Sequence, residues 1–133
     1  MRDCGFNMKH VYLAAKLGEK EHLLEKVKDL NSIRYKNTAS WIYGGEEGLS
    51  REEIAQLDLQ DIEKSDVLIL FTHPRGSPQT GGGRFVEFGY AMAKGKECIV
   101  IGPYENVFMH TVGVKQYDTW EKFLNETCSD NVI

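Results

Sequence analysis

A strand, a glycine-rich loop and a helix follow one another between residues 66 and 94, and this succession constrains the fold most. Residues 66–71 are almost entirely apolar, as expected of a parallel strand buried on both faces. The glycines at 81–83 leave backbone N–H groups accessible to an anion, and the pattern over 83–94 predicts a helix. Ligands of open α/β sheets bind at the carboxyl ends of the strands. The succession therefore predicts a site for a sugar phosphate beside an acidic side chain.

Strand patterns and helix patterns alternate along the rest of the chain. Further strands are predicted at 10–15, 33–36, 97–101 and 112–117, and further helices over 18–30, over 50–65 and after Asp118 or Thr119. Ser50 and Glu53 have the spacing of a capping box. The glycines of the loop 37–45 predict irregular structure there. Such alternation predicts an α/β sandwich of the Rossmann or flavodoxin type, with about five parallel strands and helices on both faces.

Composition predicts a single domain spanning residues 1–133. A chain of 133 residues with 41% hydrophobic content can bury one sizeable core, and residues 1–7 lack periodicity and are predicted to be flexible. The net charge of −4 argues against binding to a nucleic acid polymer. No apolar run or leader pattern indicates a membrane partner or export, which predicts a cytoplasmic protein. Three distant cysteines, Cys4, Cys98 and Cys128, have no disulfide or zinc spacing.

Glu87 is the acidic residue best placed for chemistry. It follows the glycine loop by about one helical turn, within the run Gly-Arg-Phe-Val-Glu-Phe-Gly-Tyr-Ala at 83–91. The positive end of the helix dipole favours an ionised carboxylate there. Such a carboxylate is a suitable nucleophile toward the anomeric carbon of a sugar. The alternative interpretation is that Glu87 only complements the helix dipole.

A second carboxylate is predicted from the acidic segment 58–66. Asp58 and Asp61 share one side of their helix because of their i, i+3 spacing. Asp58 is the better geometric candidate if its helix begins near the ligand edge, whereas Asp66 opens its strand at the amino end, away from that edge. A solvated charge on a helix face is the alternative interpretation for each of them.

Several other side chains are candidates for binding the ligand. Glycines let a phosphate approach the backbone, basic side chains supply positive charge, and aromatic side chains stack on a base or enclose a sugar. These candidates are Gly81, Gly82, Gly83, Arg84, Lys16, Trp41 and Tyr12. The alternatives are a flexible connection for the glycines, solvated charges for the basic residues and core packing for Tyr12. His73 and His110 have no partner at a recognisable spacing and are left out of the mechanism.

Over residues 8–124 the sequence resembles the nucleoside 2-deoxyribosyltransferase superfamily, especially its 2′-deoxynucleoside 5′-phosphate N-hydrolases. The resemblance rests on Val-Tyr-Leu-Ala at 11–14, on Asp-Leu at 58–59, on Ser-Asp-Val-Leu at 65–68 and on Glu-Phe-Gly-Tyr-Ala at 87–91. The last run is the most specific, because family members carry Glu, a hydrophobic residue, Gly, any residue and Ala. The sequence departs from the hydrolase branch at 16–20, Lys-Leu-Gly-Glu-Lys, where that branch has an arginine-containing, glycine-rich turn.

The resemblance implies that Glu87 attacks the anomeric carbon and forms a glycosyl-enzyme intermediate, while an aspartate assists departure of the base. That aspartate matches either Asp58 or Asp66, and both are kept. Water then releases the sugar in a hydrolase, whereas a second base receives it in a transferase. The implied partner is a small nucleoside or its 5′-monophosphate, with no metal or organic cofactor. Family members complete their sites with a neighbouring subunit, which implies a homodimer or larger homo-oligomer.

Two other functions are compatible with the same residues. One is a nucleotide phosphoribohydrolase of the lysine-decarboxylase-like type, whose motif is partly similar to residues 81–87, although its fuller Pro-Gly-Gly pattern is missing. The other is a non-catalytic protein that sequesters or senses a nucleotide through the same loop. Tight stoichiometric binding with no product released would favour the non-catalytic protein.

Overall fold

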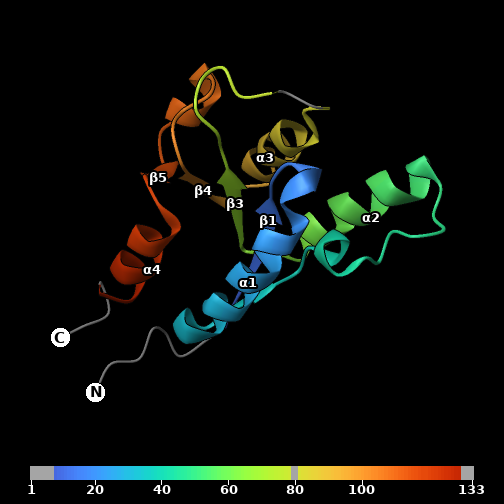
Figure 1. Ribbon diagram of the computed structural model, residues 1–133, viewed down its shortest axis with the longest axis horizontal. Helices are drawn as coiled ribbons and strands as arrows, with labels where there is room; N and C mark the ends of the chain where they lie inside the picture. The colour runs from blue at the N-terminus through green and yellow to red at the C-terminus, as the bar shows by residue number, and fades with distance from the viewer. Residues whose placement is uncertain (1–7, 79–80, 130–133) are drawn as a thin grey trace.

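The computed structural model describes residues 8–78 and 81–129, and within them five parallel strands form one sheet (Figure 1). The strand order is β2-β1-β3-β4-β5, with bounds β1 (Lys9–Ala14), β2 (Tyr35–Asn37), β3 (Val67–Phe71), β4 (Glu97–Ile101) and β5 (Lys115–Tyr117). The α-helices are α1 (Lys20–Leu30), α2 (Arg51–Glu63), α3 (Gly83–Ala93) and α4 (Trp120–Ser129). Short 3-10 helices are η1 (Leu17–Glu19), η2 (Asn31–Ile33), η3 (Ser40–Tyr43) and η4 (Val107–His110). The predicted α/β fold class is confirmed.

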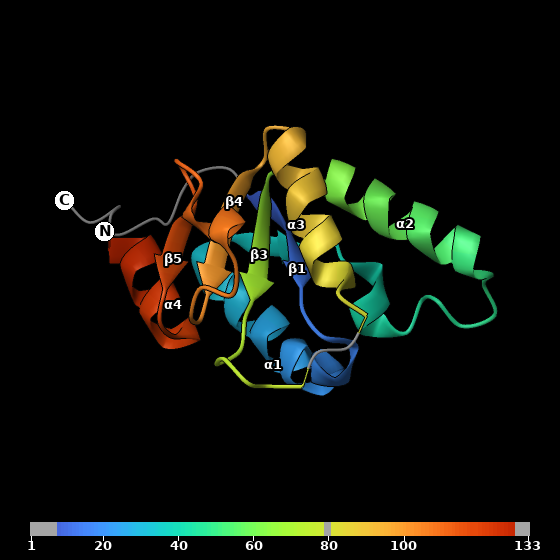
Figure 2. The ribbon, with the colours of Figure 1, turned by 90° about the horizontal axis from the view of Figure 1, so that it is seen from above.

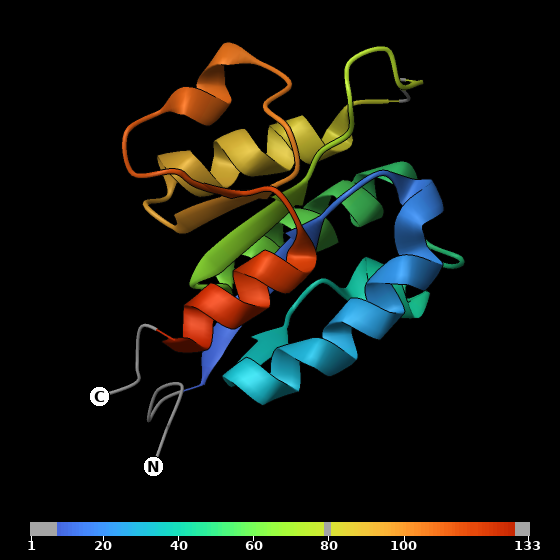
Figure 3. The ribbon, with the colours of Figure 1, turned by 60° about the vertical axis from the view of Figure 1, so that its left-hand side comes forward.

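Helices cover both faces of the sheet. Helices α1 and α4 lie on one face, where the Trp120 Nε1 donates to Asp29 Oδ2 at 2.9 Å (Figure 2). Helices α2 and α3 lie on the other, where the Tyr90 hydroxyl donates to Glu63 Oε2 at 2.6 Å (Figure 3). The central strands β1 and β3 are therefore covered on both sides, which is why their apolar runs are continuous. Because all strands run in parallel, their carboxyl ends share one edge of the sheet.

Most predicted elements are present, and the differences are local. Strand β2 begins two residues later than predicted because η2 occupies the chain before it, and Arg34 then takes a left-handed φ of 60°. Strand β5 is confined to three residues. The loop 37–45, predicted to be irregular, contains η3, whose buried Trp41 and Ile42 pack into the core ahead of the glycines. The predicted capping box is confirmed: Ser50 Oγ accepts from the Glu53 N–H at 3.1 Å, and Glu53 Oε1 accepts from the Ser50 N–H at 2.8 Å.

Some sequence-based expectations concern parts of the chain that the structure does not describe. The predicted flexibility of residues 1–7, together with Cys4 and the side chain of Cys128, lies outside the described residues. Cys98 is buried in β4, and burial raises the pKa of its thiol to about 11. No helix in the described ranges is long and apolar enough to cross a membrane.

The ends of β3 and β4 approach each other very closely. Gly102 has a φ of +115°, and a Cβ there would lie 2.5 Å from Thr72 Oγ1 and 2.9 Å from the Thr72 carbonyl oxygen. Thr72 Oγ1 donates to the Pro103 carbonyl at 2.5 Å, which joins the two strand ends by a side chain as well as by the ladder. Only glycine fits at 102. This tight corner lies on the same edge of the sheet as the candidate site.

Candidate active site

A cavity of about 740 Å³ opens at the carboxyl end of β1, between α2 and α3. Its size lies within the range of small-molecule sites. One wall is a face of α2, whose lining residues recur at helical spacing, and the opposite wall comes from the glycine loop and the start of α3. The lining residues are Ala15, Lys16, Leu17, Trp41, Glu46, Arg51, Ile54, Ala55, Asp58, Gly81, Gly83, Arg84 and Glu87.

Glu87 is held by a tyrosine from the neighbouring strand. The hydroxyl of Tyr12, a buried residue of β1, donates to Glu87 Oε2 at 2.7 Å. Burial raises the pKa of Glu87 to about 7, and the Tyr12 hydrogen bond acts against that rise by favouring the ionised form. The position near the start of α3 was expected to keep the carboxylate ionised, but burial is the larger influence. Burial and the charge of Glu87 also raise the pKa of Tyr12, so the phenol remains a hydrogen-bond donor.

Asp58 faces Glu87 across a cluster of acidic groups. Burial raises the pKa of Asp58 to about 8, with further contributions from the hydrogen bond and charge of Glu46 and from the charges of Glu87 and Asp61. Asp61 itself is buried and accepts from the Ser40 N–H at 2.9 Å, which ties the start of η3 to α2. The raised pKa of Asp58 therefore favours its neutral form at neutral pH, while the pKa of Glu87 lies near neutrality.

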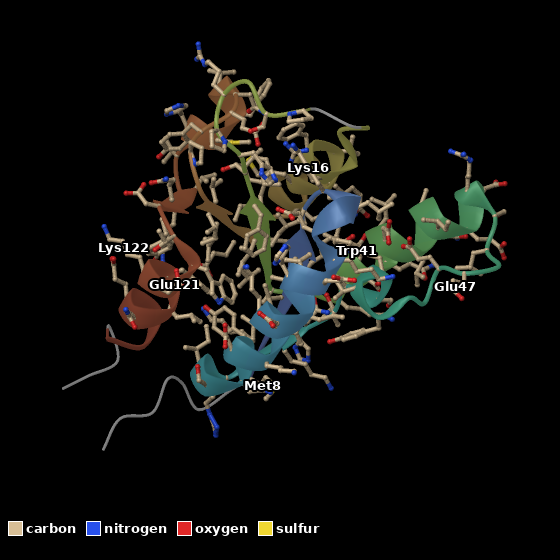
Figure 4. All side chains as sticks on the ribbon, in the orientation of Figure 1. Met8, Lys16, Trp41, Glu47, Glu121 and Lys122 are labelled. Carbon is tan, nitrogen blue, oxygen red and sulfur yellow. The ribbon has the colours of Figure 1, made fainter. Side chains whose placement is uncertain are left out.

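The basic residues of the cavity have different surroundings. Lys16 Nζ donates to the Pro78 carbonyl and lies beside the cavity at the end of β1 (Figure 4). Arg51 is exposed at the first position of α2. Arg84 is buried, and its Nη2 donates to Glu105 Oε2 at 2.9 Å while its guanidinium lies over the Phe85 ring. The positive charge available to a ligand anion is therefore greatest at Lys16 and Arg51.

The structure brings most of the predicted site residues together. Glu87, Asp58, Lys16, Trp41, Gly81, Gly83 and Arg84 line the cavity. Gly82 precedes α3 as its N-cap with a φ of 80°, and Tyr12 reaches the site through Glu87. The Trp41 indole is fixed because its Nε1 donates to the Leu13 carbonyl at 3.2 Å.

Asp66 does not lie at the cavity. Its Oδ2 accepts from the His10 N–H at 2.9 Å at the amino end of β3, which is the opposite edge of the sheet, and its side chain is 60% exposed. Asp66 was predicted at this edge from the topology as well. The position of this side chain supports a structural contact between β1 and β3.

Glu46 and Arg51 were missed by the sequence analysis. Glu46 lies in the loop ahead of α2, where no helical or strand periodicity points to it. The neighbouring glycines were the only sequence signal in that loop, and they indicate a turn and not a functional side chain. Arg51 and Ile54 share helical spacing with Asp58, a signal that was present in the sequence but that does not by itself say which face borders a cavity.

The arrangement is suited to substitution at a carbon bearing a leaving group that needs a proton. One carboxylate, Glu87, is held by a neutral donor, whereas burial and the neighbouring Glu46 favour the protonated form of the other carboxyl, Asp58. Two titratable groups with different environments can divide the roles of nucleophile and acid. Within residues 8–78 and 81–129, no group of three His, Cys, Asp or Glu side chains is arranged to hold a metal ion.

Three solved structures are similar over nearly the whole chain. A CMP N-glycosidase from Clostridium botulinum has 25% sequence identity and a TM-score of 0.62, with 89% of this chain and 97% of that chain covered. A 2-deoxyribosyltransferase from Leishmania mexicana has 15% identity and a TM-score of 0.70, with 93% and 99% covered. A 2-deoxyribosyltransferase from Bacillus psychrosaccharolyticus has 18% identity and a TM-score of 0.68, with 87% and 90% covered.

These similarities define the fold. The chain has the fold of the nucleoside deoxyribosyltransferases, and the solved structures that resemble it include an N-glycosidase as well as deoxyribosyltransferases. No profile of a protein family matches the sequence. No curated protein sequence matches it either.

Proposed function

We propose that this protein is an enzyme that cleaves or transfers the N-glycosidic bond of a nucleoside, deoxynucleoside or corresponding 5′-monophosphate. The observation that carries the proposal is the pair of carboxyl groups in one cavity, with Glu87 bonded to Tyr12 and with the pKa of Asp58 raised by burial and by Glu46. Similarity to a CMP N-glycosidase at 25% identity supports the same class of reaction.

In the first step, Glu87 attacks the anomeric carbon of the sugar. A carboxylate oxygen forms a bond to that carbon while the bond to the base nitrogen breaks and its electron pair leaves with the base. Asp58 donates its proton to the departing base, which leaves neutral. Tyr12 keeps the attacking carboxylate oriented during this step.

In the second step, the glycosyl ester on Glu87 is resolved. Asp58, now a carboxylate, accepts a proton from the incoming water or base as that nucleophile attacks the anomeric carbon. The bond to Glu87 breaks and its carboxylate is restored. Water gives the free sugar or sugar phosphate, and a second base gives a new nucleoside. Only side chains of the protein take part, with no metal or organic cofactor.

The cavity also has features suited to the rest of the substrate. The left-handed loop at Gly81 and Gly82 and the nearby Lys16 and Arg51 favour a phosphate, while the fixed Trp41 ring offers an apolar wall. We also propose that the protein is cytoplasmic and forms a homodimer or larger homo-oligomer. Light scattering of the purified protein measures its assembly state.

The test is release of free base from a panel of nucleosides and 5′-monophosphates, ribo and deoxy, with and without a second base. Glu87→Gln, which keeps the shape of the side chain, should lower turnover by about 10⁴-fold or more because the nucleophile is lost. The matched control is Glu47→Gln, a glutamate exposed on the loop ahead of α2 (Figure 4). Retention of full turnover by Glu87→Gln would refute the mechanism.

Other outcomes decide between the alternatives. Exchange of the base into a new nucleoside identifies a transferase, and release of the base without exchange identifies a hydrolase. Tight binding with no base released from any substrate indicates a protein that sequesters or senses a nucleotide.

A further inference from the structure

Glu46 is an acidic residue of the cavity to which the proposed reaction assigns no step. It lies between η3 and α2, in a loop that turns at Gly44 and Gly48, both with a φ of +80°. The Glu46 carbonyl accepts from the Leu49 N–H at 3.3 Å, so the residue belongs to a closed turn that leads directly into the capped start of α2. The turn places this side chain at the same wall of the cavity as Asp58.

The two carboxyl groups of Glu46 and Asp58 are in hydrogen-bond contact. Glu46 Oε2 and Asp58 Oδ1 are both buried, and neither receives a hydrogen bond from a donor among the described residues. Two buried carboxylates in contact would present only acceptors to each other, which is costly. A single proton on the pair supplies the missing donor and removes one of the two charges.

The charges around the pair favour a proton on Asp58. Asp61 on its own helix and Glu87 on α3 both act on Asp58, and the phenol of Tyr12 on β1 is close enough for Asp58 to influence it. Two cations of the cavity have other partners: Arg84 is paired with Glu105, and Lys16 Nζ donates to the Pro78 carbonyl. The third cation, Arg51, is exposed to solvent at the cavity wall.

We propose that Glu46 is a positioning residue that keeps the proton of the free enzyme on Asp58, ready for transfer to the leaving base. The use of that proton in catalysis rests on the proposed function, whereas its presence on Asp58 does not. As the base departs with the electron pair of the glycosidic bond, the proton moves from Asp58 to the base nitrogen. The two carboxylates then repel each other, which increases the basicity of Asp58 toward the incoming water.

The test is a pH titration of Asp58 in the whole protein without substrate. The titration is monitored by ¹³C NMR of the side-chain carboxyl groups. The Asp58 signal is assigned by its loss in Asp58→Asn. In Glu46→Gln, the negative charge is gone and an amide faces Asp58, so the apparent pKa of Asp58 should fall by about one unit or more. Glu47→Gln is the matched control and should leave it unchanged.

A second readout is the pH dependence of turnover. The alkaline limb of the pH profile should move to lower pH in Glu46→Gln and in Glu46→Ala, with turnover at pH 6 retained. Glu46→Asp keeps a carboxylate, so its alkaline limb should lie closer to that of the wild type. A purely structural role for Glu46 would lower turnover at every pH without moving the limb. That result, or an unchanged Asp58 titration in folded Glu46→Gln and Glu46→Ala, overturns the inference.

Failure of the proposed function has a different signature. If Glu87→Gln remains fully active or no substrate is cleaved, the proposed reaction is wrong, but the NMR titration still decides whether Glu46 holds the proton on Asp58. A circular dichroism melt of each variant confirms that the titrations compare folded proteins.

Discussion

The two walls of the cavity hold their carboxyl groups in opposite ways. On the β1–α3 side, Glu87 receives a hydrogen bond from the neutral Tyr12 hydroxyl, a partner that favours the charged form. On the α2 side, Asp58 contacts a second carboxyl, Glu46, a partner that favours the neutral form. Burial raises the pKa of both acids, and the donor beside one and the second carboxyl beside the other then shift the two pKa values in opposite directions.

After the loss of the nucleophile in Glu87→Gln, the largest effect is expected from Asp58→Asn, which removes the acid of the α2 side. Asparagine keeps the size of the side chain but cannot deliver its proton, so turnover should fall by about 10²–10⁴-fold. Substrates whose leaving group departs as a stable anion should be affected far less, and this contrast is measured by steady-state kinetics on both kinds of substrate. An equal loss for both kinds would mean that Asp58 does not protonate the base.

A smaller effect is expected from Tyr12→Phe on the other side. Loss of one hydrogen bond to a charged group lowers turnover by about 10–100-fold. Since that bond lowers the pKa of Glu87, its removal should also move the acidic limb of the pH profile upward from about 7. Tyr43→Phe, an exposed tyrosine of η3, is the control. A drop in turnover with no movement of the acidic limb would show that the Tyr12 hydroxyl does not control the ionisation of Glu87.

A third effect concerns stability and its dependence on pH. The pKa of Asp58 is raised by folding, so the stability linked to its proton is present at low pH and is lost as the pH rises through about 8. Asp58→Asn removes this loss, because the amide stays neutral. The Tm of the variant relative to wild type should increase by a few degrees between pH 5 and pH 9. Calorimetry across that range measures the difference, and parallel curves would contradict a raised pKa.

The smallest effect is expected at Asp66, which lies at the other edge of the sheet. Asp66→Asn keeps an acceptor for the His10 N–H, so turnover should match wild type and stability should change by no more than about 0.5 kcal/mol. Kinetics on the same substrates measure this. A loss of activity comparable with that of Asp58→Asn would reverse the assignment of the two aspartates.

The sequence was sufficient for elements whose signal is local. Strands β3 and β4 are continuous apolar runs, and the start of α2 is specified by Ser50 and Glu53 alone. Glu87 could be found because it follows a glycine loop at the start of a helix. These predictions did not require knowledge of the tertiary contacts between distant segments.

The rest depends on contacts between distant segments. The partner of Asp58 comes from a loop twelve positions earlier in the chain, where nothing periodic marks Glu46. Arg84 was expected either to bind phosphate or to be solvated, yet it is buried against Glu105, twenty-one residues away. The direction of the Glu87 pKa shift also follows from burial, which a sequence pattern does not measure. Pairings of this kind require the packed structure.

The corner at Gly102 has a consequence for how this chain can vary over evolutionary time. A methyl group there would overlap Thr72, a residue that also holds the end of β3 to the segment leading to Glu105, the partner of Arg84. Gly18 has open space around it and no left-handed dihedral, so other residues can replace it without steric conflict. Lineages that share this corner can diverge at Gly18, but they inherit position 102 unchanged.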